Sequence, residues 1–161
     1  MIYLDNAATT FKKPINVIEA INHALTSYGN SGRGAYRTAL DSGRMVYETR
    51  EKISKFFGSS DPSKVIFTSN ATEGLNIVLF GLFGSGDHVI STVTEHNSVL
   101  RPLYKLEKTK NIDIDFIGID ESGKLKYDEF EKHMKGNTKA IIVNHVSNVS
   151  GEIADLEYME K

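Results

Sequence analysis

The chain has 161 residues, of which 40% are hydrophobic and 25% are charged, and its formal net charge at pH 7 is −2. This composition predicts one well-packed folded domain and excludes a disordered chain. The 19 basic residues are balanced by 21 acidic ones, which argues against a nucleic-acid-binding surface. Because the chain contains no cysteine, it has no disulfide, thiolate metal site or sulfur nucleophile, and we assign no metal ligands.

The N-terminal stretch MIYLDNAATT has neither the basic start nor the long apolar core of a signal peptide. No apolar run in the sequence is long enough to span a bilayer. We therefore expect a soluble, cytoplasmic protein with no membrane partner.

Residues 1–58 are predicted to form an N-terminal segment with two helices. The small and hydroxylated run 6–10 predicts a close-packed loop. Pro14 opens the first helix, whose apolar residues recur on one face as far as Gly29. The second helix runs from about residue 36 to 57. Between them, the glycine-rich loop 29–34 reads most simply as a flexible linker, although it carries Arg33 as a candidate ligand.

Residues 59–161 alternate between short apolar strands and amphipathic helices. Strands are expected at 65–68, 88–93, 112–119 and 140–143, and helices at 72–83, 98–108 and 127–134. The final residues place Ile153, Leu156 and Met159 at helical spacing. Consecutive βαβ units predict an α/β fold with three layers, in which a mainly parallel sheet is flanked by helices on both faces.

The stretch VIFTSNATEGLNIVLFG, from Val65 to Gly81, is predicted to be a strand, a tight turn and a helix. The start of such a helix presents unpaired N–H groups and a positive dipole end, which suit a phosphate. Ala71 allows close approach to the backbone, and Thr72 adds a hydroxyl. The simpler alternative is an ordinary helix cap made by residue 69 or 70, with Glu73 as a favourable charge in the first turn.

Two further polar clusters follow predicted strands, at 94–98 and 144–148. Because the carboxyl ends of parallel strands share one edge of the sheet, both clusters should lie beside the start of the 72–83 helix. His96 and Asn148 would then border one pocket with Thr72. Taken singly, His96 also fits a surface loop or a position next to a helix cap, and Asn148 also fits a turn before Gly151.

The chain resembles the N-terminal half of the cysteine desulfurase and selenocysteine lyase family, within class V of the pyridoxal-phosphate-dependent aminotransferases. Five motifs carry this resemblance in the family's order, between residues 3 and 151: YLDNAATT, NSGRGAY, ATEGLN, TEHNSVLRP and VNHVSNVSG. The NSGRG loop is more similar to the branch with SufS-type desulfurases and selenocysteine lyases than to the IscS-like branch.

The resemblance implies a fold type I enzyme, of which residues 59–161 would be part of the large cofactor-binding domain. It implies that Ala71 and Thr72 hold the phosphate of pyridoxal 5′-phosphate. His96 would stack on the ring and act in catalysis, and Asn148 would hydrogen-bond the ring hydroxyl. Less strongly, it places the loop containing Asn6 and Ala7 on the substrate side and the Arg33 loop toward the partner's site in the family's dimer.

The sequence also departs from the family pattern. It has no His-Lys pair to supply the Schiff-base lysine, and Asp155 in ADLEY does not match the family's Asp-small-small-Gln motif. The nucleophilic cysteine is absent too. We therefore expect about the first two-fifths of such an enzyme, inactive alone and without covalently bound cofactor.

The activity implied by the family is removal of sulfur or selenium from cysteine or selenocysteine, as in iron–sulfur cluster assembly. A related class V aminotransferase, lyase or epimerase stays open as an alternative. A non-catalytic α/β domain that binds a phosphorylated ligand or serves assembly is a second alternative. Exposed sheet edges and apolar patches predict homodimerisation or other self-association.

Overall fold

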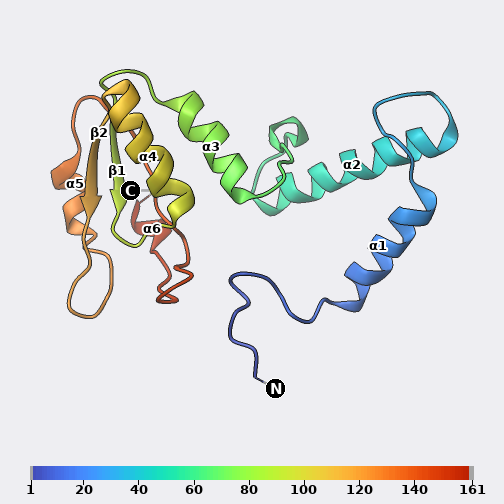
Figure 1. Ribbon diagram of the computed structural model, residues 1–161, viewed down its shortest axis with the longest axis horizontal. Helices are drawn as coiled ribbons and strands as arrows, with labels where there is room; N and C mark the ends of the chain where they lie inside the picture. Colours follow the sequence, from blue (N-terminus) through green and yellow to red (C-terminus); the bar gives the residue numbers. More distant parts are fainter. Residues whose placement is uncertain (1, 160–161) are drawn as a thin grey trace. The chain divides into compact units, whose positions relative to one another are not determined.

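The computed structural model describes residues 2–159. The chain divides into two compact units, the first extending through Phe67 and the second beginning at Thr68. Figure 1 labels their elements along the chain, and each unit is described by itself.

The first unit contains α1 (Ile15–Ser27), α2 (Arg37–Phe56) and the short 3₁₀ helix η1 (Pro62–Lys64). Both long helices confirm the segments predicted from apolar periodicity. The turn between them is fastened by the buried hydroxyl of Ser42, which accepts the N–H of Gly29 at 3.0 Å and donates to the Thr38 carbonyl at 2.7 Å. At the end of α2, Gly58 has φ of +72°, a left-handed conformation that glycine adopts without strain.

Helix α1 leaves its apolar side chains largely uncovered. None of its residues is buried, and Ile21 and Leu25 are 54% and 79% exposed. Within the first unit, the apolar face of the helix is therefore largely exposed. None of the helices within residues 2–159 is both long and apolar enough to cross a membrane.

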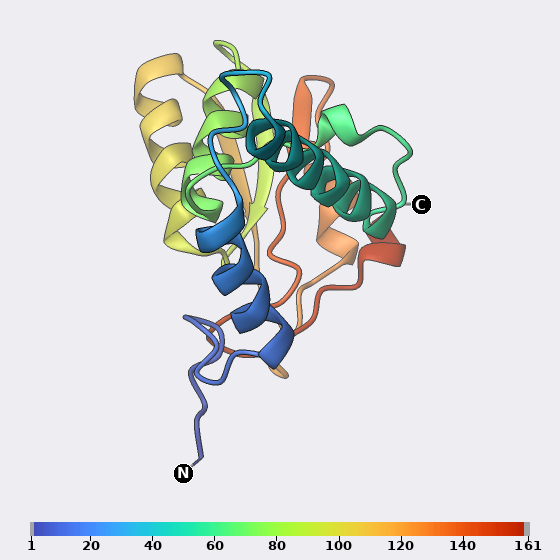
Figure 2. The same cartoon turned by 90° about the vertical axis from the view of Figure 1, so that its right-hand side faces the viewer.

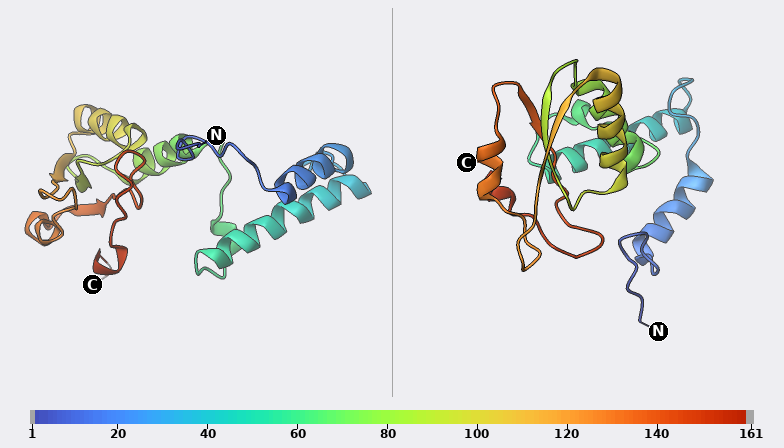
Figure 3. Two further views of the ribbon diagram at one scale, coloured as in Figure 1. Left: turned by 90° about the horizontal axis from the view of Figure 1, so that it is seen from below. Right: turned by 60° about the vertical axis from the view of Figure 1, so that its left-hand side comes forward.

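The second unit is built on a three-stranded parallel sheet, which confirms the predicted fold class. Its strands are β1 (His88–Thr92), β2 (Asp113–Ile117) and β3 (Thr138–Ile141), in the order β2-β1-β3. Figure 3 shows the strands side by side. All five residues of the central strand β1 are buried, as expected for a strand covered on both faces.

Helices cover both faces of this sheet (Figure 1). On one face lie α3 (Ala71–Leu82) and α4 (Asn97–Lys110), and the core on this side is a cluster of seven buried apolar residues that includes Val89 of β1. On the other face lies α5 (Asp128–His133), whose Phe130 contacts Ile90 and Ile117. Val89 and Ile90 thus point to opposite layers, because successive strand residues alternate between faces.

Two sequence predictions are wrong. Residues 65–68 are not a strand, because this segment pairs with no other strand in the described chain and Ile66 is 76% exposed. Ile153 is not helical, because it forms an antiparallel bridge with Val146. Of the predicted terminal helix, the structure shows the short α6 (Leu156–Met159).

A charged cluster lies at the amino end of the sheet, opposite the edge where the strands end. Asp115 on β2 accepts hydrogen bonds at its Oδ2 atom from Lys135 at 2.8 Å and from the imidazole Nε2 of His88 at 3.1 Å. His133, at the end of α5, contacts the same oxygen at 3.2 Å. The bond from Lys135 is the largest of the causes that lower the pKa of Asp115 to about 2.

Candidate functional site

The start of α3 is closed by two reciprocal hydrogen bonds. The side chain of Asn70 accepts the N–H of Glu73 at 2.8 Å, and the Glu73 carboxylate accepts the N–H of Ser69 at 2.6 Å. The bond from Ser69 is also the main cause that lowers the pKa of Glu73. The ordinary helix cap considered from the sequence is therefore present.

This cap leaves two backbone donors free at the same helix end. Within residues 2–159, the N–H groups of Ala71 and Thr72 donate no hydrogen bond, and both residues are exposed. The Thr72 hydroxyl likewise has no partner in this part of the chain, while its carbonyl accepts the side-chain amide of Asn76 at 2.7 Å. Two unpaired N–H groups, a hydroxyl and the positive end of the helix dipole together suit an anion such as a phosphate.

The second polar cluster follows β1, where His96 is the N-cap of α4. Its Nδ1 atom accepts the backbone N–H of Ser98 at 3.1 Å and lies 2.8 Å from the Ser98 hydroxyl. Because a backbone N–H can only donate, Nδ1 is an acceptor and the neutral ring carries its proton on Nε2. The capping role fixes one edge of the ring, while the residue as a whole stays exposed.

A groove of about 240 Å³ joins the first and second clusters. It lies between α3 and α4, which run side by side in Figure 2. Its lining residues come from both helices: Thr72, Asn76, Phe80, Asn97, Ser98, Arg101, Pro102 and Lys105. Thr72 and the residues directly after His96 therefore border one hollow, whose cationic side chains favour a negatively charged occupant.

The third cluster is part of a small hairpin that follows β3. Ser147 donates its N–H to the Glu152 carbonyl at 2.9 Å, and its own carbonyl accepts the N–H of Gly151 at 2.9 Å. Together with the bridge between Val146 and Ile153, these bonds hold the loop as a tight turn. Asn148 lies exposed in this turn, which agrees with the simpler turn role considered for it.

Glu95 connects the second and third clusters, and the sequence reasoning did not single it out. Its Oε1 atom accepts the backbone N–H of Asn144 at 2.5 Å. Burial is the largest influence on this carboxyl and raises its pKa, although the hydrogen bond from Asn144 acts in the opposite direction. The available sequence signal was the place of Glu95 directly after the β1 strand and before His96.

The groove at Thr72 is lined by neither His96 nor Asn148, so the structure connects the three predicted residues only through their neighbours. Thr72 shares a groove with the start of α4, and the His96 loop is bonded through Glu95 to the segment that leads to Asn148. No hydrogen bond joins the side chains of Thr72, His96 and Asn148 to one another within residues 2–159.

The weaker candidates, Asn6, Ala7 and Arg33, lie in the first unit and are exposed. The loop that contains the first two is closed by the Tyr3 hydroxyl, which donates to the Thr9 carbonyl at 2.9 Å. Their placement gives no further information about a ligand.

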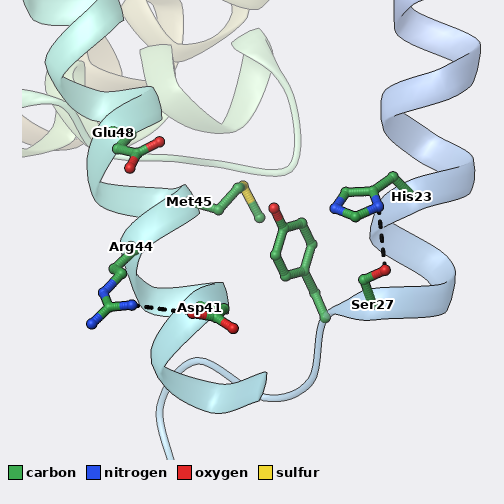
Figure 4. A pocket seen from close by; sticks show the side chains of 7 residues that line it. His23, Ser27, Asp41, Arg44, Met45 and Glu48 are labelled. Carbon is green, nitrogen blue, oxygen red and sulfur yellow. Dashed lines mark hydrogen bonds and ion pairs between the residues drawn. The ribbon is translucent and has the colours of Figure 1, made fainter. Parts of the chain in front are cut away.

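A second hollow, of about 340 Å³, lies within the first unit between the end of α1 and the start of α2 (Figure 4). Its polar side chains pair locally. His23 Nδ1 lies 3.2 Å from the Ser27 hydroxyl, and Arg44 lies 3.2 Å from Asp41. Because each pair belongs to one helix, we assign no ligand to this hollow.

Comparison with known proteins points to one family. A model of the aminotransferase class-V family matches residues 2–161. A probable cysteine desulfurase from Pyrococcus abyssi is 36% identical over 165 residues, which cover 100% of this chain and 40% of that protein.

Solved structures agree with the sequence comparison. An apo cysteine desulfurase from Thermococcus onnurineus NA1 has a TM-score of 0.89 and 34% identity, with 98% of this chain and 40% of that chain covered. A structure of SspA in complex with cysteine has a TM-score of 0.86 and 26% identity, with 99% and 46% covered. The chain thus spans about two-fifths of the length of the curated relatives it matches.

Proposed function

Because this chain belongs to the aminotransferase class-V family, we propose that it forms the N-terminal portion of a pyridoxal-phosphate-dependent cysteine desulfurase. The observation that carries the proposal is the start of α3, where Ala71 and Thr72 offer two unpaired N–H groups beside an exposed hydroxyl. The relatives named above support the desulfurase reading within the family.

The residues present fit the cofactor. The α3 start has the donors that a phosphate ester needs. The His96 ring is exposed and its Nδ1 edge is fixed by Ser98, so its orientation is set before a ligand arrives. Asn148 is exposed and can donate through its side-chain amide.

Each residue then has a separate task. Ala71 and Thr72 bind the phosphate and set the position of the ligand. His96 packs on the ring and can hold a proton at Nε2, and Asn148 donates to the ring oxygen. When bound, pyridoxal phosphate supplies an electron sink for bond cleavage in an amino acid.

The substrate and assembly of the whole enzyme are part of this proposal. We propose cysteine, or a similar amino acid, as the substrate, supported by the cysteine bound to SspA. We further propose a cytoplasmic homodimer that supplies sulfur for iron–sulfur cluster assembly, with Asn6, Ala7 and Arg33 facing the substrate or the partner's site. These 161 residues contain no cysteine and no His-Lys pair, so the chain by itself should release no sulfur.

Pyridoxine 5′-phosphate tests the cofactor site, because its alcohol cannot attach to lysines as an aldehyde does. Titration of the isotopically labelled chain, followed by nuclear magnetic resonance, should show saturable shifts of the amides of Ala71 and Thr72, the His96 ring and the Asn148 side chain. Pyridoxine without its phosphate serves as the control and should bind much more weakly. Shifts confined to other parts of the chain, or no saturation, would contradict the proposal.

The same titration distinguishes the proposed cofactor site from the alternative, a non-catalytic domain that binds phosphorylated ligands. The phosphate donors at α3 would serve that alternative equally well, since they need no lysine. Equal affinity for inorganic phosphate and for pyridoxine 5′-phosphate, with no change at His96 or Asn148, would support it. A clear preference for the ring-bearing ligand supports the cofactor site.

A further inference from the structure

Glu95 occupies the junction between the loops that follow β1 and β3. Its Oε1 atom accepts the Asn144 N–H at 2.5 Å and the Thr92 hydroxyl at 3.4 Å. Thr92 is fully buried at the end of β1, and its hydroxyl also lies 3.0 Å from that of Thr94. The carboxylate is therefore held from the β1 side while it binds the backbone on the β3 side.

The bond to Asn144 comes just beyond the last ladder contact between the two strands. The Ile142 N–H donates to the Ile90 carbonyl at 2.8 Å, and no later backbone hydrogen bond joins the two segments within residues 2–159. The hairpin that carries Asn148 then closes on itself, with the Ala154 N–H donating to the His145 carbonyl at 2.8 Å. The Ser91 hydroxyl bonds the Ile142 carbonyl at 3.3 Å, and the Asp155 N–H bonds the Tyr127 hydroxyl at 2.7 Å on the far side of the hairpin. Between these two points, the bond at Glu95 is the hydrogen bond within residues 2–159 that ties the segment leading to Asn148 to the loop after β1.

The same side chain is adjacent to the other ring-contacting candidate. Glu95 directly precedes His96, whose ring is fixed by its cap on Ser98. A displacement of Glu95 would therefore change the position of His96 as well as release Asn144. One carboxylate links both residues that the proposed function assigns to the cofactor ring.

We propose that Glu95 is a positioning residue that holds His96 and Asn148 at a fixed separation for a planar ring ligand. The inference rests on the proposed function for its ligand, while the anchoring itself stands on the hydrogen bond between Glu95 and Asn144. Glu95 touches no ligand atom in this role. It acts by fixing the two loops from which the ligand contacts come.

A carboxylate suits this role for a physical reason. The Asn144 N–H has no other acceptor in the described residues, and an ionised oxygen makes a shorter and stronger bond to a backbone N–H than a neutral one. A neutral amide in place of the carboxyl would keep an acceptor of the same length. Aspartate, whose side chain is one methylene shorter, would keep the charge, but its oxygen would lie farther from the Asn144 N–H.

Three variants separate these effects: Glu95→Ala, Glu95→Asp and Glu95→Gln. The matched control is Glu121→Ala, because Glu121 is an exposed acidic residue in the turn before residue 125. In the whole chain, hydrogen exchange of the Asn144 amide should accelerate about tenfold or more in Glu95→Ala and Glu95→Asp, as loss of one such bond implies. Glu95→Gln should restore most of the protection, and Glu121→Ala should match the native chain.

Ligand affinity is the second measurement, because a purely structural role of Glu95 would not change the preference for pyridoxine 5′-phosphate over inorganic phosphate. Affinity for pyridoxine 5′-phosphate should fall about tenfold in Glu95→Ala and Glu95→Asp, while affinity for inorganic phosphate stays within about twofold, because the α3 start is untouched. Glu95→Gln should restore the affinity for pyridoxine 5′-phosphate. If Glu95→Ala does not fold, Glu95→Asp carries the same comparison.

The outcomes also separate this inference from the proposed function. If the native chain does not bind pyridoxine 5′-phosphate, the proposed function fails, and the inferred role in holding a ring ligand fails with it, whatever the exchange data show. If the native chain binds the ligand but the Glu95 variants bind it equally well, only the inference is overturned. Unchanged exchange of Asn144 in Glu95→Ala and Glu95→Asp would overturn it directly.

Discussion

The buried imidazole of His88 lies with its Nε2 atom 3.1 Å from Oδ2 of Asp115, so the first residue of the central strand is bonded to the middle of the neighbouring strand. The other ring nitrogen of His88 lies 2.7 Å from the hydroxyl of Thr138, which begins β3. One side chain thereby connects all three strands at the amino end of the sheet. The opposite edge carries the loops that contain the proposed ligand contacts.

This network predicts a loss of stability in acid. The pKa of Asp115 falls from its ordinary value of 3.8 to about 2 in the folded chain. A lowered folded-state pKa contributes stability that is present above pH 4 and is lost as the pH falls from about 4 to 2, and a shift of this size corresponds to about 2 kcal/mol.

Asp115→Asn should therefore lower the free energy of unfolding by about 2 kcal/mol near neutral pH and by almost nothing at pH 2. Urea denaturation of both chains across this pH range measures the difference. Glu121→Gln, at an exposed position, is the control and should follow the native curve. A constant difference at all pH values would show that the aspartate acts through packing rather than through its charge.

Thr72→Val should weaken phosphate binding without unfolding the second unit. The substitution removes an exposed hydroxyl donor and keeps a β-branched side chain of similar size, so we expect a loss of about 1 kcal/mol in binding. Calorimetric titration with phosphate measures it, and circular dichroism checks the fold. Affinity equal to that of the native chain would exclude the Thr72 hydroxyl as a ligand contact.

Pyridoxal phosphate should label no single lysine of this chain. The sequence has no His-Lys pair, so the aldehyde can react only with scattered surface amines. Borohydride reduction followed by peptide mapping should give several partial modifications. One stoichiometrically labelled lysine would disprove this expectation and identify a binding site for the aldehyde.

The uncovered apolar face of α1 predicts self-association. Ile21 and Leu25 are 54% and 79% exposed, and exposed apolar patches of this kind seek partners. Sedimentation should show dimers or larger species that Leu25→Glu reduces. Glu19→Gln, an exposed change on the same helix, should leave the distribution unaltered, and a uniform monomer in the native chain would refute the expectation.

The fold of the second unit was largely predictable because its signals are local. Apolar periodicity located α3 and α4, and each of the three observed strands overlaps a stretch that the sequence predicted as a strand between turn signals. Residues 65–68 carry the same local signal, but a strand also requires a partner, and that requirement is not local. Ile66 is exposed, and residues 65–68 pair with no strand in the described chain, so the local signal alone did not produce a strand.

The sequence predicted where the polar clusters fall along the chain but not how they are connected. Three polar clusters after strands or before helices indicated one edge of the sheet, as the βαβ topology requires. The role of Glu95 depends on a contact with Asn144, 49 residues away, which no spacing rule reveals. The capping bond of His96 likewise became evident only from the structure.

A crystal structure of the chain with pyridoxine 5′-phosphate tests the central claim most directly. The account predicts the phosphate on the N–H groups of Ala71 and Thr72, the ring against His96, and the ring oxygen beside the amide of Asn148. Density for the ligand away from the α3 start, or coordinates that place these side chains on opposite edges of the sheet, would contradict the claim that this chain contains part of a desulfurase cofactor site.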